Sequence, residues 1–151
     1  MLTIDMKLSK ESRKTLDKYP GRFKNGIIKG MKSAMLFAEG EAKKSFGRPG
    51  NLKVGTGHLR RSIRSNVKVS GSNVIGSVES NVRYAEIHEI GGIIRARNAK
   101  YLHFKVDNRW VKVKQVTIPA RPYLRPAIED NLPKIGDIIS NHILKETGGI
   151  E

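Results

Sequence analysis

The segment of this chain that most resembles a catalytic motif is His88-Glu89-Ile90-Gly91-Gly92. Its first two residues match the start of the HExxH motif, in which two histidines one helical turn apart bind zinc and the glutamate acts as a general base. Position 92 is a glycine, so the second histidine ligand is absent. The segment therefore argues against a metalloprotease.

A glycine-rich stretch, GRPGNLKVGTG at residues 47–57, resembles a phosphate-binding loop in its glycines alone. Thr56-Gly57 follows Gly55 where nucleotide hydrolysis needs a lysine and a serine or threonine to reach phosphate and magnesium. We expect no nucleotide hydrolysis. Four glycines and a proline in eleven residues instead predict a flexible loop over 47–57, mobile in the free protein and ordered on assembly.

The other candidate groups predict no catalysis. Glu86 and Glu89 share a helical face, and we expect them to form a solvated or interface pair. The chain has no cysteine, which removes thiol nucleophiles, disulfides and cysteine-ligated metals. The histidines lack metal-ligand spacing and are expected to be surface or structural residues: His58, His88, His103 and His142. We therefore predict no enzymatic activity, no metal site and no cofactor.

Length and composition indicate one folded domain with a strongly basic surface. The 151 residues are 38% hydrophobic and 28% charged, with a net charge of +15. Residues 1–62 hold fifteen basic and five acidic side chains, residues 63–118 ten and four, and residues 119–151 four and five. Such a field favours partners rich in phosphate or carboxylate. Without a long apolar run or a signal peptide, we expect no membrane association and a product that stays in the cytoplasm where it is made.

Helical patterns occupy both ends of the chain. We expect a basic N-terminal extension over 1–19 with a short helix from Ser9 to Lys18, and a long helix from about Pro20. The long helix carries one apolar stripe: Phe23, Ile27, Met31, Ala34, Ala38, Ala42 and Phe46. Its small residues, such as Gly26 and Gly30, would let another backbone approach closely. A final helix presents Ile128, Leu132, Ile135, Ile139 and Ile143, and Pro133 is expected to kink it.

The middle of the chain changes to a period of two. A short turn capped by Thr56 precedes a hairpin over 63–80 that turns at Gly71-Ser72-Asn73, and Tyr84 to Ile90 forms a helical segment. Further strands are expected over 93–97, 101–106 and 110–118, with Asp107-Asn108-Arg109 as the turn between the last two. The sequence thus predicts an α+β fold, with a long N-terminal and a C-terminal helix packed on a four- to five-stranded, mainly antiparallel sheet in a single domain over 20–151.

Three motifs occur in order along this plan. They are TGHLRRSI at 56–63, YAEIHEIGG at 84–92 and IPARPYLRPA at 118–127. In this combination the chain resembles, over roughly residues 20–146, the small neck proteins of tailed double-stranded DNA phages. These are the tail-completion or head–tail joining proteins, also called the phage virion morphogenesis family.

This resemblance implies a structural virion protein of the phage neck. Such a protein forms a homo-oligomeric ring, commonly a hexamer, between the portal or connector protein and the tail tube or tail terminator protein, and genomic double-stranded DNA passes through it. Pro119, Pro122 and Pro126 would hold Arg121, Tyr123 and Arg125 on a rigid segment that contacts a neighbour, unless that segment merely joins sheet to helix. Tyr84, His88 and Glu89 either fix the adjacent turn or touch a neighbouring subunit.

Five basic residues are candidates to face the DNA: Arg60, Arg61, Arg64, Lys43 and Lys44. Their contacts would be to phosphates, which carry no sequence information. The alternative is a free basic nucleic-acid-binding protein without sequence-specific readout, which the charge alone would support. Aromatic residues are few and follow no RNA-recognition or zinc-finger pattern, which favours the neck protein.

Overall fold

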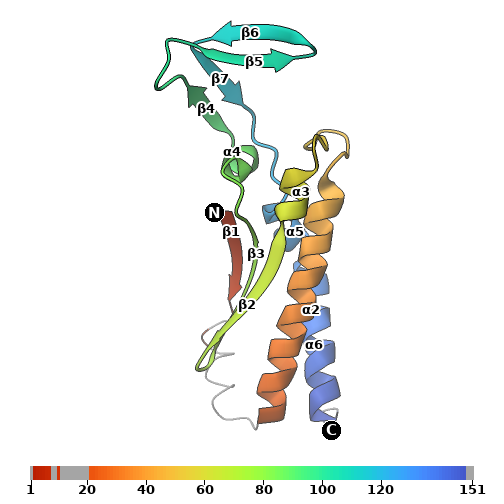
Figure 1. Cartoon of the computed structure of the whole chain (residues 1–151). Coiled ribbons are helices and arrows are strands. Elements are labelled where there is room, and N and C mark those ends of the chain that lie inside the picture. The colour runs from red at the N-terminus through yellow and green to blue at the C-terminus, as the bar shows by residue number, and fades with distance from the viewer. Residues whose placement is uncertain (1, 8–9, 11–20, 149–151) are drawn as a thin grey trace.

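A computed structural model describes residues 2–7, 10 and 21–148, and shows an elongated molecule with a body of helices and one sheet at one end and β-ribbons at the other (Figure 1). The strands are β1 (Leu2–Lys7), β2 (Arg64–Ser70), β3 (Asn73–Ser80), β4 (Gly92–Arg95), β5 (Leu102–Val106), β6 (Arg109–Val113) and β7 (Gln115–Ile118). The helices are α2 (Gly21–Ser45), α3 (His58–Ser62), α4 (Ala85–Ile90), α5 (Arg125–Glu129) and α6 (Leu132–Thr147).

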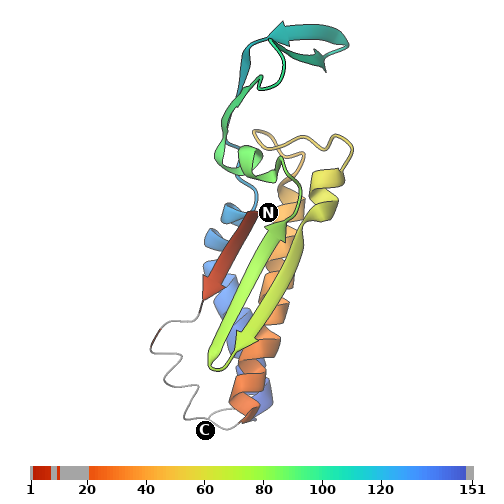
Figure 2. The same cartoon turned by 60° about the vertical axis from the view of Figure 1, so that its left-hand side comes forward.

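The body is a three-stranded antiparallel sheet backed by helices. Its strand order is β1-β3-β2, α2 lies across one face, and α6 packs alongside α2 (Figure 2). The core lies between α2 and the sheet, where Met31, Met35 and Val78 are completely buried. A side chain at Gly76 of β3 would collide with both methionines, so this glycine sets how closely α2 approaches the sheet.

Helix α2 follows the predicted apolar stripe. Five members of the stripe are buried, and Phe23 and Phe46 at its two ends are partly buried against the same core. The predicted close approach of another backbone is confirmed at Gly26 and Gly30. A Cβ at these positions would lie 2.7 Å from the Ile143 Cα atom and 2.8 Å from the Ile139 Cα atom of α6, respectively.

The C-terminal helix is two helices, which corrects the expected kink at Pro133. Helix α5 ends at Glu129, and Pro133 lies in the first turn of α6, which begins at Leu132. The first turn has no intrahelical use for the missing proline N–H, so Pro133 starts a helix there and bends nothing. Ile135 is buried as expected, but Leu132 is half exposed.

The α+β class is confirmed, with a correction to the arrangement of the strands. They form three separate antiparallel sheets, because β4 pairs only with β7 and β5 only with β6 among the described strands. The expected strand over 110–118 is divided at Lys114 into β6 and β7. Strand β1 was not predicted at all: it adds residues 2–7 of the expected N-terminal extension to the body sheet. The short helix expected over Ser9–Lys18 lies outside the described residues, except for Lys10.

The two outer sheets make a projection that we call the arm, residues 92–118. Figure 1 shows β4 and β7 rising from the body beside α4, and β5 and β6 lying across their far end. The predicted turn at the tip is confirmed, with Asp107 and Asn108 at φ values of +46° and +62°. Left-handed residues at both positions suit a tight two-residue hairpin. None of the other described elements covers the arm as a second layer, and Ile93 remains 51% exposed.

Candidate interaction site

Glu89 joins two of the three motifs through its carboxylate. It is 3% exposed, and its Oε2 atom accepts hydrogen bonds from the Tyr123 and Leu124 N–H groups at 2.8 and 3.0 Å. Its Oε1 atom accepts from the Arg125 N–H at 2.9 Å. These amides open α5, whose first N–H groups have no partners within the helix. Glu89 is thus not half of the expected solvated or interface pair with Glu86, because its buried carboxylate is used by three backbone N–H groups of the same chain.

The backbone around Glu89 strengthens the same junction. The His88 carbonyl accepts a hydrogen bond from the Arg121 N–H at 2.8 Å. Gly91 has a φ of +75°, and a Cβ there would lie 2.8 Å from the Ala120 nitrogen. Helix α4 therefore fixes both the base of the arm and the proline-rich segment 119–126. Of the two readings left open for Glu89, the structure supports fixing the turn.

Tyr123 corrects the expected interface, since it is a core residue. It is 2% exposed, and its ring meets Phe46 edge to face with centroids 5.1 Å apart. Within the described part of the chain its hydroxyl has no hydrogen-bond partner. Burial, together with the nearby Glu89 charge, raises the pKa of Tyr123 above its usual value. A large aromatic side chain between prolines suits an interface and a core equally well, so the sequence could not separate the two.

Arg121 and Arg125 flank Tyr123 and point out of the core. Both are exposed on the segment that Glu89 and His88 hold. A guanidinium presented from a fixed backbone can bind a carboxylate with two parallel hydrogen bonds at a small entropic cost. Their role at an interface stays a prediction.

Tyr84 and His88 form an aromatic row with His58. The Tyr84 hydroxyl lies 3.1 Å from the His58 Nδ1 atom, and its ring meets that of His88 edge to face at 5.9 Å. The row borders a cavity of about 240 Å³ that is also lined by residues 52–57 of the glycine-rich loop. Burial, and next the charge of Arg121, lower the pKa of His88. Tyr84 is 41% exposed, so it remains available to a partner.

Four of the five residues expected to face DNA lie together. Lys43, Arg60, Arg61 and Arg64 line an open cavity of about 480 Å³ whose remaining wall is residues 54–57. Lys44 is not part of this group; it pairs with Glu41 at 2.7 Å. Three arginines and a lysine around backbone of the TG motif make a surface suited to an anion of phosphate size.

Glu39 holds this cationic cavity in place, although it belongs to none of the three motifs. Its carboxylate contacts Lys43 at 2.5 Å and accepts from the Ser65 N–H at 2.7 Å and hydroxyl at 2.8 Å. Burial alone would raise its pKa, but Lys43 and Ser65 together hold the pKa of Glu39 below its ordinary value. Nothing in the local sequence links position 39 to position 65, so no motif could have shown this contact.

The remaining two histidines lie at positions that match the expected surface or structural roles. His103 is exposed on β5, and His142 is half-buried on α6. Among the residues that the structure describes, no group of three or more histidine, aspartate or glutamate side chains is placed to hold a metal ion. No described helix is both long enough and apolar enough to cross a bilayer.

Fold and site together define a small α+β protein. It has exposed arginines on a segment that hydrogen bonds hold in place, a cationic cavity and an outlying arm. The model of the phage virion morphogenesis family matches residues 38–144, from within α2 to within α6. The chain belongs to this family, which assigns it to the structural assembly of the phage virion. No curated protein and no solved structure matches the chain.

Proposed function

We propose that the protein is a structural component of the phage neck. Copies of the chain form a homo-oligomeric ring that joins the portal or connector protein on the head side to the tail tube or tail terminator protein. Genomic double-stranded DNA passes through this ring. The role needs no catalytic residue, and the family supports assembly as the activity.

The observation that carries this proposal is the way Glu89 fixes the segment 119–126. Three backbone N–H groups and the His88 carbonyl hold this segment, so Arg121 and Arg125 leave the body from a rigid base. A surface that is ordered before binding loses little entropy when a neighbour docks. In the ring, these arginines bind carboxylates of the adjacent subunit, with Tyr84 and His88 at the edge of the same contact.

The test replaces both arginines, as Arg121→Ala with Arg125→Ala, in a phage genome or an assembly extract. The exposed pair leaves the fold intact, so thermal unfolding stays at the wild-type temperature while electron microscopy shows unattached heads and tails. The matched control, Arg22→Ala with Lys32→Ala, removes the same charge from exposed positions on α2 and assembles normally. Normal joining by the arginine variant would contradict the interface.

We further propose that the cationic cavity of Lys43, Arg60, Arg61 and Arg64 lies on the lumen side of the ring. Phosphates of the passing duplex bind there without readout of the bases. Lys44, at the end of the same helix, adds to the field. A structure of the assembled neck tests this placement, and finding all five residues on the outer surface would end it.

A further inference from the structure

The arm carries many basic side chains that have no part in the subunit contact or the cationic cavity described above. Its basic residues are all exposed: Arg95, Arg97, Lys100, Lys105, Arg109, Lys112 and Lys114. Asp107 at the tip is the one acidic residue between positions 92 and 118. The ion pairs of the described residues all lie in the body, at Lys29, Lys43 and Lys44. The positive field of the arm is therefore free to meet a partner.

The β5–β6 ribbon separates its side chains into two faces. In the register of the pair, Leu102 lies opposite Val113 and Phe104 opposite Val111, and these four half-buried residues make most of one face apolar. The exposed pair Val106 and Arg109 ends that face at the turn. The alternate positions make the other face, where Lys105 lies opposite Trp110. Strand residues alternate sides, so the ribbon presents lysines and aromatic rings together in one direction.

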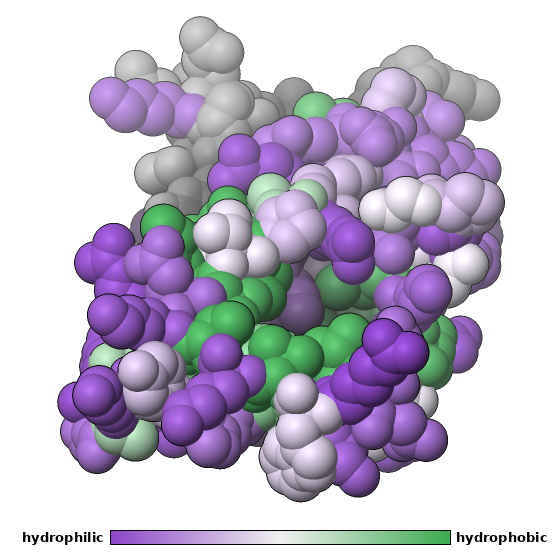
Figure 3. Space-filling view, turned by 90° about the horizontal axis from the view of Figure 1, so that it is seen from above, coloured by the Kyte–Doolittle hydropathy of each residue, from purple (hydrophilic) through white to green (hydrophobic). Residues whose placement is uncertain are grey.

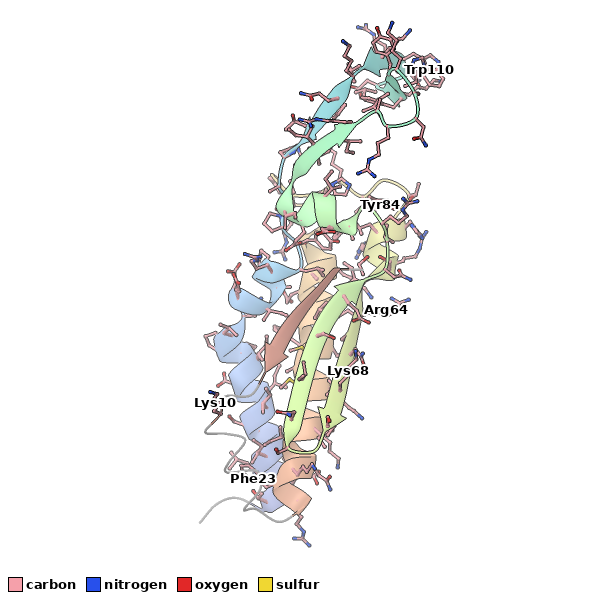
Figure 4. All side chains as sticks on the ribbon, turned by 90° about the vertical axis from the view of Figure 1, so that its left-hand side faces the viewer. Lys10, Phe23, Arg64, Lys68, Tyr84 and Trp110 are labelled. Atoms are coloured by element: carbon pink, nitrogen blue, oxygen red, sulfur yellow. The ribbon has the colours of Figure 1, made fainter. Side chains whose placement is uncertain are left out.

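Lysines and aromatic rings stack on this second face and at its edge, where Lys100 and Tyr101 precede β5. The Lys105 ammonium lies 5.3 Å from the centre of the Trp110 ring, and Lys112 and Lys100 lie 4.6 and 5.8 Å from that of Tyr101. We call these five residues the cationic face. Trp110 is 73% exposed, and Figure 4 shows it at the far end of the arm, while Tyr84 lies near the base.

The surroundings leave this face open to a large partner. Figure 3 looks onto the end of the molecule that carries the arm, with hydrophilic residues around the margin and hydrophobic ones gathered toward the middle. The arm stands clear of the body, so a double helix could approach it without meeting α2 or α6 (Figure 1). A two-stranded ribbon also has the width that the major groove of B-form DNA admits.

We propose that the cationic face of the arm binds the phosphate backbone of double-stranded DNA. The ammonium groups neutralise phosphates and release their counterions, and Trp110 packs against the sugar–phosphate surface. This contact is separate from the cationic cavity of the body. It also goes beyond the proposed ring, because one copy of the chain contains the whole face.

Trp110 makes the test direct, because it is the single tryptophan of the chain. Titration of the full-length protein with a short mixed-sequence duplex should change the tryptophan emission and protect the ring from acrylamide. The same titration at several salt concentrations gives the slope of log K against log salt. The triple variant Lys100→Ala, Lys105→Ala, Lys112→Ala should make that slope shallower by roughly two to three, since each phosphate contact contributes about 0.9.

A charge-matched control separates the arm from the overall charge. Arg22→Ala, Lys32→Ala, Lys145→Ala removes three exposed basic residues from α2 and α6 and should keep the wild-type slope and the protection of Trp110. Circular dichroism of both triple variants verifies that they fold. Equal slopes for the two variants, or DNA binding without protection of Trp110, would overturn the proposal.

Two other partners for the arm give distinct results. If the face binds acidic protein, poly-glutamate protects Trp110 and duplex DNA at equal charge does not. If it binds a second copy of the chain, the protection depends on protein concentration and needs no DNA. Either result rejects DNA as the partner. The ring is tested separately through Arg121 and Arg125, so a failure of one proposal is not mistaken for a failure of the other.

Discussion

Glu89, which lies on α4, accepts the hydrogen bonds at the start of α5 that a capping side chain of α5 itself would normally accept. Helix α5 has no side-chain cap of its own, and the three N–H groups at its start are bound by this one carboxylate. Hydrogen bonds to a buried charged acceptor are stronger than neutral ones, and losing the acceptor leaves the donors desolvated and unpaired. The position of residues 123–125 thus depends on a single side chain, while the His88 backbone holds Arg121.

Replacing Glu89 by glutamine should lower the free energy of unfolding by roughly 2–4 kcal/mol. The amide keeps one acceptor oxygen but turns an NH₂ group toward backbone donors. Chemical denaturation measures the loss. Glu86→Gln, on the exposed side of the same helix, serves as the control and should have little effect. Equal stabilities of the two variants would contradict the capping role.

Tyr123 contributes stability through its ring. Tyr123→Ala should cost about 3–5 kcal/mol, because it leaves a cavity beside Phe46. Tyr123→Phe keeps the ring and removes a hydroxyl that has no hydrogen-bond partner in the described structure, so it should unfold at or above the wild-type temperature. A tyrosine that acted at a subunit contact would show the opposite pattern: stable monomers and failed assembly for the alanine variant.

His88 should make stability depend on pH. Burial and the Arg121 charge lower its pKa in the folded state below the ordinary value of 6.5. The unfolded chain therefore binds the proton more readily, and stability falls as the pH drops below about 6.5. Comparing unfolding at pH 7.5 and 5.5 should show a smaller decline for His88→Asn than for the wild type. An equal decline would assign the effect to other groups.

At the scale of elements, glycines in α2 have opposite roles that depend on their surroundings. Gly30 lies where α6 passes so closely that a Cβ would be 2.8 Å from a backbone atom. At Gly40, no described residue outside the adjoining turns of α2 lies within 4 Å of that position. Alanine favours a helix over glycine by about 1 kcal/mol, and this gain is the same at both sites. The two substitutions therefore differ only in how the new methyl group packs.

Alanine substitutions at these two glycines should consequently change stability in opposite directions. Gly30→Ala must push α6 away and should destabilise the protein by about 1–3 kcal/mol. Gly40→Ala should stabilise it by about 0.5–1 kcal/mol. Thermal unfolding of the two variants measures both effects, and stabilisation by Gly30→Ala would show that the helices separate at little cost.

Elements set by neighbours in sequence were predictable, and those set by distant partners were not. The stripe of α2, the β2–β3 hairpin and the turn at Asp107-Asn108 arise from short periods and turn residues, so the sequence was enough to find them. Strand β1 depends on pairing with β3, and the separation of the arm from the body sheet depends on which edges meet. The same reason applies to the site: the basic cluster near Arg61 could be predicted, but the Glu39 and Glu89 contacts could not.

At the scale of the whole molecule, the loop 47–57 borders both the aromatic row and the cationic cavity. The Gly47 N–H donates to the Leu52 carbonyl at 2.7 Å, and Leu52 is buried, whereas residues 53–56 are exposed. We expect amides in the exposed stretch to exchange rapidly with deuterium in the free protein and to be protected in the assembled neck. Equal protection in the two states would contradict ordering on assembly.

The pairing of β1 has a consequence for the order in which the chain folds. The β2–β3 hairpin closes through the turn at Gly71, but Leu2 must find Ser80 across the whole of α2 and the loop that follows it. Closing so long a segment is slow because its entropy is lost before the pairing is gained. On the ribosome, β1 emerges before β3 and docks late. Until then the outer edge of β3 offers unpaired backbone groups to other nascent chains, which makes the arrival of β1 the step most open to aggregation.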